Sequence, residues 1–147
     1  MAEKLPPNPI TPEHAEKFRG AMLAWRERLG LHGWRYVKSR RPSKELAEIS
    51  EQLTEHRLVR WALGTDWGGT EIDDESLEST ACHENLHVLL HRLLEVSFAE
   101  QEYNDTVMGE EHGVIAVLEQ LLYRGAVAER ELAALKSTMK ATNGITD

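Results

Sequence analysis

The feature that most constrains this chain is a His-Glu-x-x-His stretch, formed by His83, Glu84 and His87. An α-helix places residues four apart on the same face, about 6 Å apart along its axis. Two imidazoles placed in this way can bind one metal ion from the same side. Glu84 would lie beside that ion, where its carboxylate can accept a proton from a metal-bound water. The stretch therefore predicts a helix that carries a metal site.

The residues around this stretch favour a helix over about 75–97. Apolar side chains recur there at helical spacing: Leu77, Ala81, Leu86, Leu89, Leu90, Leu93 and Leu94. Histidines among leucines need polar partners, because an unpaired buried polar group is costly. A helix with two hydrogen-bonded core histidines and no metal is therefore an alternative. His91 lies about 12 Å from His83 along such a helix, too far to share an ion, and is expected to support the site or lie on the surface.

Composition indicates one globular domain. The chain has 147 residues, of which 41% are hydrophobic, and this is enough for a core. The net charge of -8 argues against a nucleic-acid partner and against an anionic membrane. Cys82 is the only cysteine, so no internal disulfide can form, and no apolar run is long enough for a membrane span. With no apolar run at the N-terminus, the chain is expected to be cytoplasmic.

Proline and glycine divide the rest of the chain. The prolines before residue 13 predict a flexible or extended segment over 1–12, followed by a single domain over 13–142. Residues 43–56 fit either a helix or strands, and strands are favoured. The expected elements are a helix over 12–29, strands over 34–39, within 43–56 and over 57–63, a loop over 65–75, the motif helix, a loop or helix end over 98–109, a helix over 109–123, a break at Gly125 and a last helix over 127–140.

A catalytic zinc usually has three protein ligands and one open position, so a third ligand must come from elsewhere. The downstream candidates are Glu110, Glu111, His112 and Glu119. If Leu118 marks the packed face of its helix, Glu111 lies only about 20° from that face, because seven residues make almost two turns. The other candidates lie about 80° or more away. Glu111 is therefore the predicted ligand, although acidic residues at a helix start also stabilise the helix dipole.

Two stretches of the chain resemble a known family. Residues 83–90 and 111–119 look like parts of zincin-type, gluzincin-like zinc metallopeptidases, and are most similar to small metallopeptidases of bacteriophages and prophages. Residues 33–36 are similar to a Trp-containing strand of that family, and the resemblance covers roughly residues 14–123. It implies an α+β, zincin-like fold: a small mixed β-sheet packed against the motif helix, further helices at both ends, and an edge strand along the substrate cleft.

The resemblance also implies a role for each site residue. His83, His87 and Glu111 would bind Zn2+, and Glu84 would act as general acid and base in peptide hydrolysis. A peptide or protein is then the expected substrate, in the cytoplasm of a bacterial host if a phage encodes the chain. Asn85 departs from the family, in which an apolar residue is common at that position. Tyr103, Tyr123 and His112 are all candidates for stabilising the oxyanion, and the sequence does not choose among them.

Other classes of protein remain open at this point. One is a zinc-binding adaptor or phage assembly protein that keeps the fold without catalysis. Another is a di-iron helical bundle, but that needs two Glu-x-x-His elements and this chain has one, at residues 84–87. The last is a helical domain without metal. Metal content separates this last class from the others, and peptide cleavage separates a peptidase from an adaptor.

Overall fold

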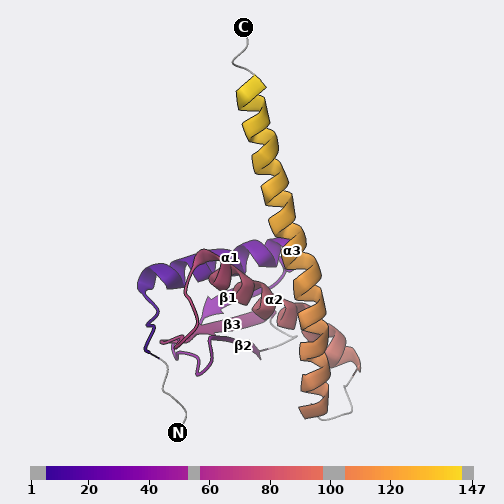
Figure 1. The fold of residues 1–147 in the computed structure, drawn as a ribbon. Helices are drawn as coiled ribbons and strands as arrows, with labels where there is room; N and C mark the ends of the chain where they lie inside the picture. Colours follow the sequence, from indigo (N-terminus) through magenta and orange to yellow (C-terminus); the bar gives the residue numbers. More distant parts are fainter. Residues whose placement is uncertain (1–5, 53–56, 98–104, 144–147) are drawn as a thin grey trace.

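The structure, a computed structural model, describes residues 6–52, 57–97 and 105–143. These residues form an α+β protein with three helices and a small mixed sheet of three strands (Figure 1). In chain order the elements are α1 (Pro12–Arg28), β1 (Arg35–Lys38), β2 (Ala47–Gln52), β3 (Leu58–Leu63), α2 (Asp74–Ser97) and α3 (Asp105–Asn143). The expected first helix, the strands and the motif helix are therefore confirmed. Part of the segment 98–109 lies outside the described residues.

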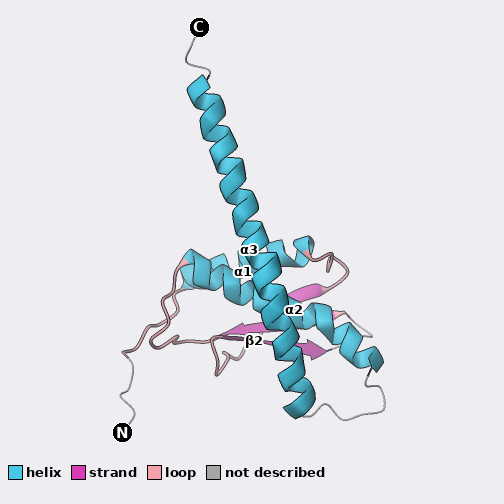
Figure 2. Ribbon diagram, turned by 45° about the vertical axis from the view of Figure 1, so that its right-hand side comes forward, coloured by secondary structure: helices cyan, strands magenta, loops and turns pink. Residues whose placement is uncertain are grey.

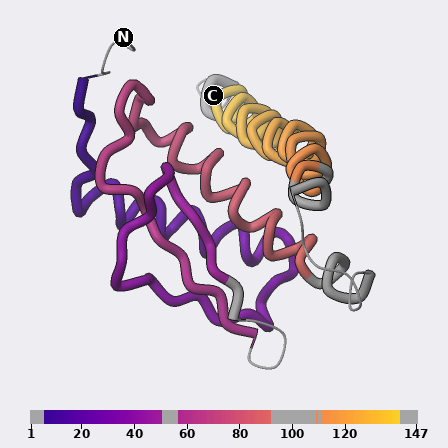
Figure 3. The backbone as a smooth tube through the Cα atoms, turned by 90° about the horizontal axis from the view of Figure 1, so that it is seen from below, coloured from indigo at the N-terminus to yellow at the C-terminus, as the bar shows by residue number. Residues whose placement is uncertain are grey.

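The sheet has the strand order β1-β3-β2. β1 is parallel to β3, and β2 is antiparallel to it, so that Trp61 of β3 lies opposite both Lys38 and Ile49. β2 is therefore an edge strand, and it packs against α2. The α2 helix in turn lies between the sheet and α3, as the view along α3 shows (Figure 3).

The main core joins α1, α2 and the sheet. Phe18 of α1 packs against Trp61 of β3 with a ring-centroid distance of 5.5 Å, and Leu77 and Ala81 of α2 join the same cluster. All four side chains are at most 3% exposed. Alternation in the first half of β3 contributes to this arrangement, because Val59 and Trp61 are buried whereas Arg60 between them is exposed, and the strand is buried throughout from Trp61 to Leu63.

Both ends of α1 have the signals that the sequence indicates. Thr11 is the N-cap: its hydroxyl accepts a hydrogen bond from the backbone N–H of His14 at 3.2 Å. The backbone N–H of Thr11 donates in return to Nδ1 of His14, at 3.3 Å, which completes a capping box with histidine in place of the usual Glu or Gln. Gly30 follows the last turn with φ of 70°, a conformation that glycine adopts without steric cost.

The N-terminal segment is extended, and several hydrogen bonds join it to the loop after β3. The backbone N–H of Asn8 donates to Oδ1 of Asp66 at 2.7 Å, and its side-chain amide donates to the carbonyl of Thr70 at 2.6 Å. Ile10 donates to the carbonyl of Thr65 at 2.9 Å. Residues 8–11 thus pack with the domain, although the prolines predict that the domain begins at residue 13.

The C-terminal part differs from the sequence prediction. The expected break at Gly125 is wrong: α3 continues through it as one helix of 39 residues. An isolated glycine costs about 1 kcal/mol relative to alanine, which helix-forming neighbours such as Ala126 and Ala128 offset. Residues 128–140 are all exposed, and this half of α3 extends beyond the other elements (Figure 2). No helix in the described ranges combines the length and apolar character that crossing a membrane requires.

A buried polar network fixes α2 against α1 and β1. Asn85 of α2 is fully buried, and its side-chain amide donates to the carbonyls of Ala81, at 2.8 Å, and Met22, at 3.2 Å. Its Oδ1 accepts a hydrogen bond of 2.6 Å from the hydroxyl of Tyr36. Burial raises the pKa of Tyr36, so this hydroxyl remains a donor. Asn85 therefore has a structural role in the core.

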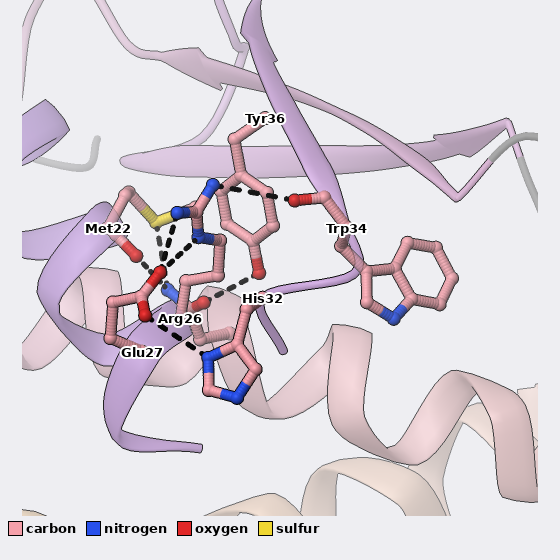
Figure 4. Close-up of polar contacts among 7 residues, drawn as sticks. Met22, Arg26, Glu27, His32, Trp34 and Tyr36 are labelled. Carbon is pink, nitrogen blue, oxygen red and sulfur yellow. Dashed lines mark hydrogen bonds and ion pairs between the residues drawn. The ribbon is translucent and has the colours of Figure 1, made fainter. Parts of the chain in front are cut away.

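Arg26 covers the outer side of this network (Figure 4). Its guanidinium lies 5.8 Å from the centre of the Tyr36 ring and donates to the carbonyl of Trp34 at 3.5 Å. Glu27 binds Arg26 at 2.6 Å and His32 at 3.1 Å. Tyr36 is thus enclosed by α2 on one side and by an arginine on the other.

Replacing Tyr36 with phenylalanine should destabilise the fold by about 1–3 kcal/mol, because Oδ1 of Asn85 loses its partner while it stays buried. Urea denaturation of the purified variant measures this change in the free energy of unfolding. Tyr123→Phe is the matched control, since the Tyr123 hydroxyl makes only a 3.5 Å exposed contact with the carbonyl of Glu75. Equal stability of the two variants would contradict the assigned role of Asn85.

Candidate metal site

The two histidines of the motif face each other on α2. Nε2 of His83 lies 3.2 Å from Nε2 of His87, and the ring centres are 5.0 Å apart. Both side chains are half-buried, at 32% and 16% exposed. The spacing of four residues brings the rings together at the surface of α2 that faces α3.

Carboxylates of α3 bind the outer nitrogens of both rings. Nδ1 of His83 lies 3.3 Å from Oε2 of Glu119, and Nδ1 of His87 lies 3.1 Å from Oε1 of Glu111. The hydroxyl of Ser79 donates to the other oxygen of Glu119 at 2.9 Å. The higher-numbered histidine pairs with the lower-numbered glutamate, so α2 and α3 run in opposite directions at the site.

These contacts determine which nitrogens can bind a cation. An ionised carboxylate only accepts hydrogen bonds, so each Nδ1 must carry the proton that it donates. A neutral imidazole then has its lone pair on Nε2. The lone pairs of His83 and His87 therefore face each other at 3.2 Å. Two lone pairs repel at this distance unless a proton or a metal ion lies between them.

The 3.2 Å separation matches a shared metal ion. Two nitrogens bound at about 2.0–2.1 Å to one tetrahedral ion lie about 3.3 Å apart. Metal-bound histidines commonly donate their other N–H to a carboxylate, which fixes ring orientation, and both rings do so here. The residues present thus fit a metal ion in donor type, spacing and supporting contacts.

His112 of α3 lies beside the pair. Its ring centre is 4.8 Å from that of His87 and 5.9 Å from that of His83. One nitrogen from each of the three rings lies within 4.8 Å of the others, close enough for all three to bind one ion. Because His112 is exposed, the site opens to solvent on its side. Three histidines leave the fourth position of a tetrahedral ion open.

The structure thus brings His83 and His87 together, and it places both the predicted third ligand and His112 next to them. Glu111 is buried, at 6% exposed, and contacts the outer nitrogen of His87. As a ligand it would have to leave that contact, whereas His112 adds a third imidazole without disturbing it. Glu119 contacts His83. The side chain of Glu110 lies outside the described residues.

The sequence places His112 among the downstream candidates but does not single it out as a ligand. His112 lies about 120° around the helix from Leu118, and this angle argues against His112 as a ligand only if the site lies at the centre of the packed face. The histidines instead lie at the edge of the interface between α2 and α3, where a residue next to Glu111 can reach them.

Glu84 and His91 occupy the same side of α2. Glu84 is buried, at 7% exposed, and lies about 60° around the helix from His87. It projects toward the sheet side of α2, where Val88 is buried. His91 is half-buried one turn beyond His87.

Burial lowers the pKa of His87, and the carboxylate of Glu111 raises it by a smaller amount. The unfolded chain therefore takes up a proton on this ring near pH 6.5 while the native metal-free protein does not. As the pH is lowered from about 7 to about 5, the free energy of unfolding of the metal-free protein should therefore decrease. His87→Gln should reduce this dependence, and urea denaturation in chelator at each pH measures it. An identical pH dependence in the variant would exclude the effect.

Metal affinity should distinguish His112 from Glu111. If His112 is a ligand, His112→Ala should lower the metal affinity by more than about 100-fold. Glu111→Gln and Glu119→Gln should each lower it by about 10- to 100-fold, because these glutamates only orient a ligand. Competition with a chromophoric chelator measures all three. His32→Ala, at an exposed histidine outside the site, is the control. A larger loss for Glu111→Gln than for His112→Ala would assign the third position to Glu111.

Comparison of the chain with known proteins adds no assignment. No protein-family model matches it. A search of curated proteins finds no match, and neither does a search of solved structures. The chemistry of the site must therefore be argued from its own geometry: two facing imidazoles, two carboxylates behind them and a third histidine beside them.

Proposed function

We propose that this protein is a zinc-dependent metallopeptidase of zincin-like type. The observation that carries the proposal is the facing pair of Nε2 atoms, 3.2 Å apart, with a carboxylate on each outer nitrogen. A cation between the two nitrogens relieves their repulsion, and their separation suits a metal ion of tetrahedral geometry. Zinc is the ion of choice because imidazole nitrogens suit it and it is mostly four-coordinate.

His83, His87 and a residue of α3 would hold the ion. His112 is favoured over the predicted Glu111 because it can bind without breaking the contact between Glu111 and His87. Bound zinc supplies a water of lowered pKa and polarises a carbonyl oxygen. The residues around the ion would orient its ligands and leave room for the substrate. Glu111 and Glu119 keep both imidazoles in the tautomer that presents Nε2, and the open side at His112 admits substrate.

Glu84 is the proposed general base. It follows the first histidine on α2 and lies on the flank of the histidine pair that faces the sheet. Its carboxylate would accept a proton from the attacking water and pass it to the leaving amine. Glu84 is buried, at 7% exposed, so its carboxylate is shielded from bulk water.

The sheet supports a peptide as substrate. β2 is an edge strand and packs against α2, the helix that carries the histidines. An edge strand has backbone N–H and C=O groups that can pair with an extended peptide. A peptide bound along β2 would run beside the flank of α2 on which Glu84 lies. This arrangement agrees with the cleft that the family resemblance implies.

Replacing Glu84 with glutamine should abolish turnover, by at least about 100-fold, and leave zinc bound, because the amide cannot accept the proton. Cleavage of a fluorogenic peptide library by zinc-loaded protein measures turnover, and elemental analysis measures zinc. Glu78→Gln, on the same helix where Glu78 pairs with Arg130, is the matched control and should keep full activity.

Three results would contradict the proposal. Zinc-loaded wild type that cleaves no peptide of the library would favour the alternative of a zinc-binding adaptor without catalysis. Undiminished cleavage by Glu84→Gln would remove Glu84 from the reaction. Absence of bound metal from wild type, with an intact fold, would exclude both zinc classes.

A further inference from the structure

The long helix α3 has an apolar face that no other described element covers. The exposed large apolar side chains of this helix are Val114, Val117, Leu121, Leu132, Leu135 and Met139. Each of them is between 48% and 68% exposed. Single exposed leucines are ordinary on a protein surface, but a row of them along one helix usually marks an interface.

Most of these residues follow a heptad repeat. Positions spaced alternately by four and three hold Val114, Leu118, Leu121, Gly125, Ala128, Leu132, Leu135 and Met139. We call this row the α3 seam. The pattern runs without interruption for more than three heptads, and it holds only apolar or small residues. Such a repeat is the signature of a two-stranded coiled coil, in which the first and fourth positions of each heptad, a and d, face the partner.

Most of the α3 seam lies away from the face of α3 that packs against the body, and Leu118, which packs against the edge of that core, lies where the two faces meet. Ile115 is fully buried and marks the body-facing side, together with Ala126. At 100° per residue, Leu121 and Leu132 lie about 100–120° around the helix from Ile115. One helix thus has two apolar faces: the first is buried against α2, and the second is exposed except at the half-buried Leu118 and Gly125.

We propose that the α3 seam binds a second copy of this chain in a parallel, in-register coiled coil. The flanking charges support a second copy as the partner. In a parallel pair, a residue at position g lies near the residue five positions later, at e, on the other helix. Arg124 then meets Glu129 of the second copy, and Glu131 meets Lys136. Every charged e and g residue between 124 and 138 thus meets an opposite charge.

The register of the charges favours the parallel arrangement. Within the described residues, Glu131 and Lys136 have no ion-pair partner in their own chain, although Glu129 also pairs with Arg28 at 2.8 Å. An antiparallel pair would instead bring together residues at equivalent heptad positions. In the antiparallel register that joins Glu129 to Lys136, Glu131 lies near the neutral Thr138. In the parallel pair every charged e and g residue lies opposite a residue of the other sign, whereas in this antiparallel pair Glu131 has no opposite charge beside it.

Oligomeric state gives the first test. Wild-type protein should be a dimer by sedimentation or light scattering in the micromolar range, and Leu132→Glu should be a monomer, because a charge at this position repels its own copy across the seam. Ser137→Glu is the matched control, since residue 137 is exposed on the side of α3 away from the seam. Monomeric wild type, or a dimer that Leu132→Glu leaves intact, would overturn the proposal.

Charge exchange tests the register. Glu131→Lys and Lys136→Glu should each weaken the dimer, because each places like charges opposite one another. The double variant should regain affinity, since it restores opposite charges in reversed order. In the antiparallel arrangement the double variant would stay weak, because the new carboxylate at position 136 would face Glu129. Failure of the double variant to recover would therefore overturn the parallel register.

Cross-linking tests the orientation directly. Leu135→Cys should form a disulfide-linked dimer on oxidation, because residue 135 meets its own copy across a parallel seam. Ser137→Cys, on the opposite side of the helix, should not. Wild type should also remain uncross-linked, since its one cysteine, Cys82, is fully buried. A dimer that Leu135→Cys fails to cross-link would overturn the parallel arrangement.

Discussion

Two imidazole nitrogens that face each other at 3.2 Å are the constraint on which the site depends. A neutral ring could avoid the repulsion between the two lone pairs by carrying its proton on Nε2. The carboxylates of Glu111 and Glu119 disfavour this tautomer, because they hold the protons on the outer nitrogens. A cation between the rings changes this repulsion into attraction. Since Glu111 and Glu119 belong to α3, a bound ion would also stabilise the docking of α3 on α2. Metal binding would thus be coupled to the packing of the two helices.

The rotation of α2 about its axis is what aims the two rings at α3, and Asn85 fixes that rotation. Its amide and carbonyl bind groups from α1, β1 and α2 itself in a fully buried position. A shift of α2 by one residue would turn every side chain by about 100° and would leave this amide unsatisfied. A polar residue in the core therefore contributes specificity that an apolar residue at the same position would not supply.

Much of the fold follows from local patterns in the sequence. Thr11 and Gly30 define α1, a largely apolar run that ends at Gly64 defines β3, and leucine spacing defines α2. The predicted break at Gly125 is wrong because a local breaker is outweighed by its helix-forming neighbours. Within the site, the histidine pair is a local feature on one helix. The carboxylate contacts and the place of His112 depend on how α3 crosses α2, which no spacing within either helix encodes.

Two contacts would explain the length of α3: one with α2 and one with a second copy of the chain. Its first half is stabilised by α2 through Ile115 and Ala126, but residues 128–140 extend from the body with every side chain exposed. Isolated helices of this length are marginal in water, because helix formation is costly to nucleate and few contacts repay the lost entropy. A second helix along the α3 seam supplies those contacts. Because Leu121 and Leu132 of the seam lie about 100–120° from Ile115, a partner there leaves the contacts of Ile115 and Ala126 with the body undisturbed.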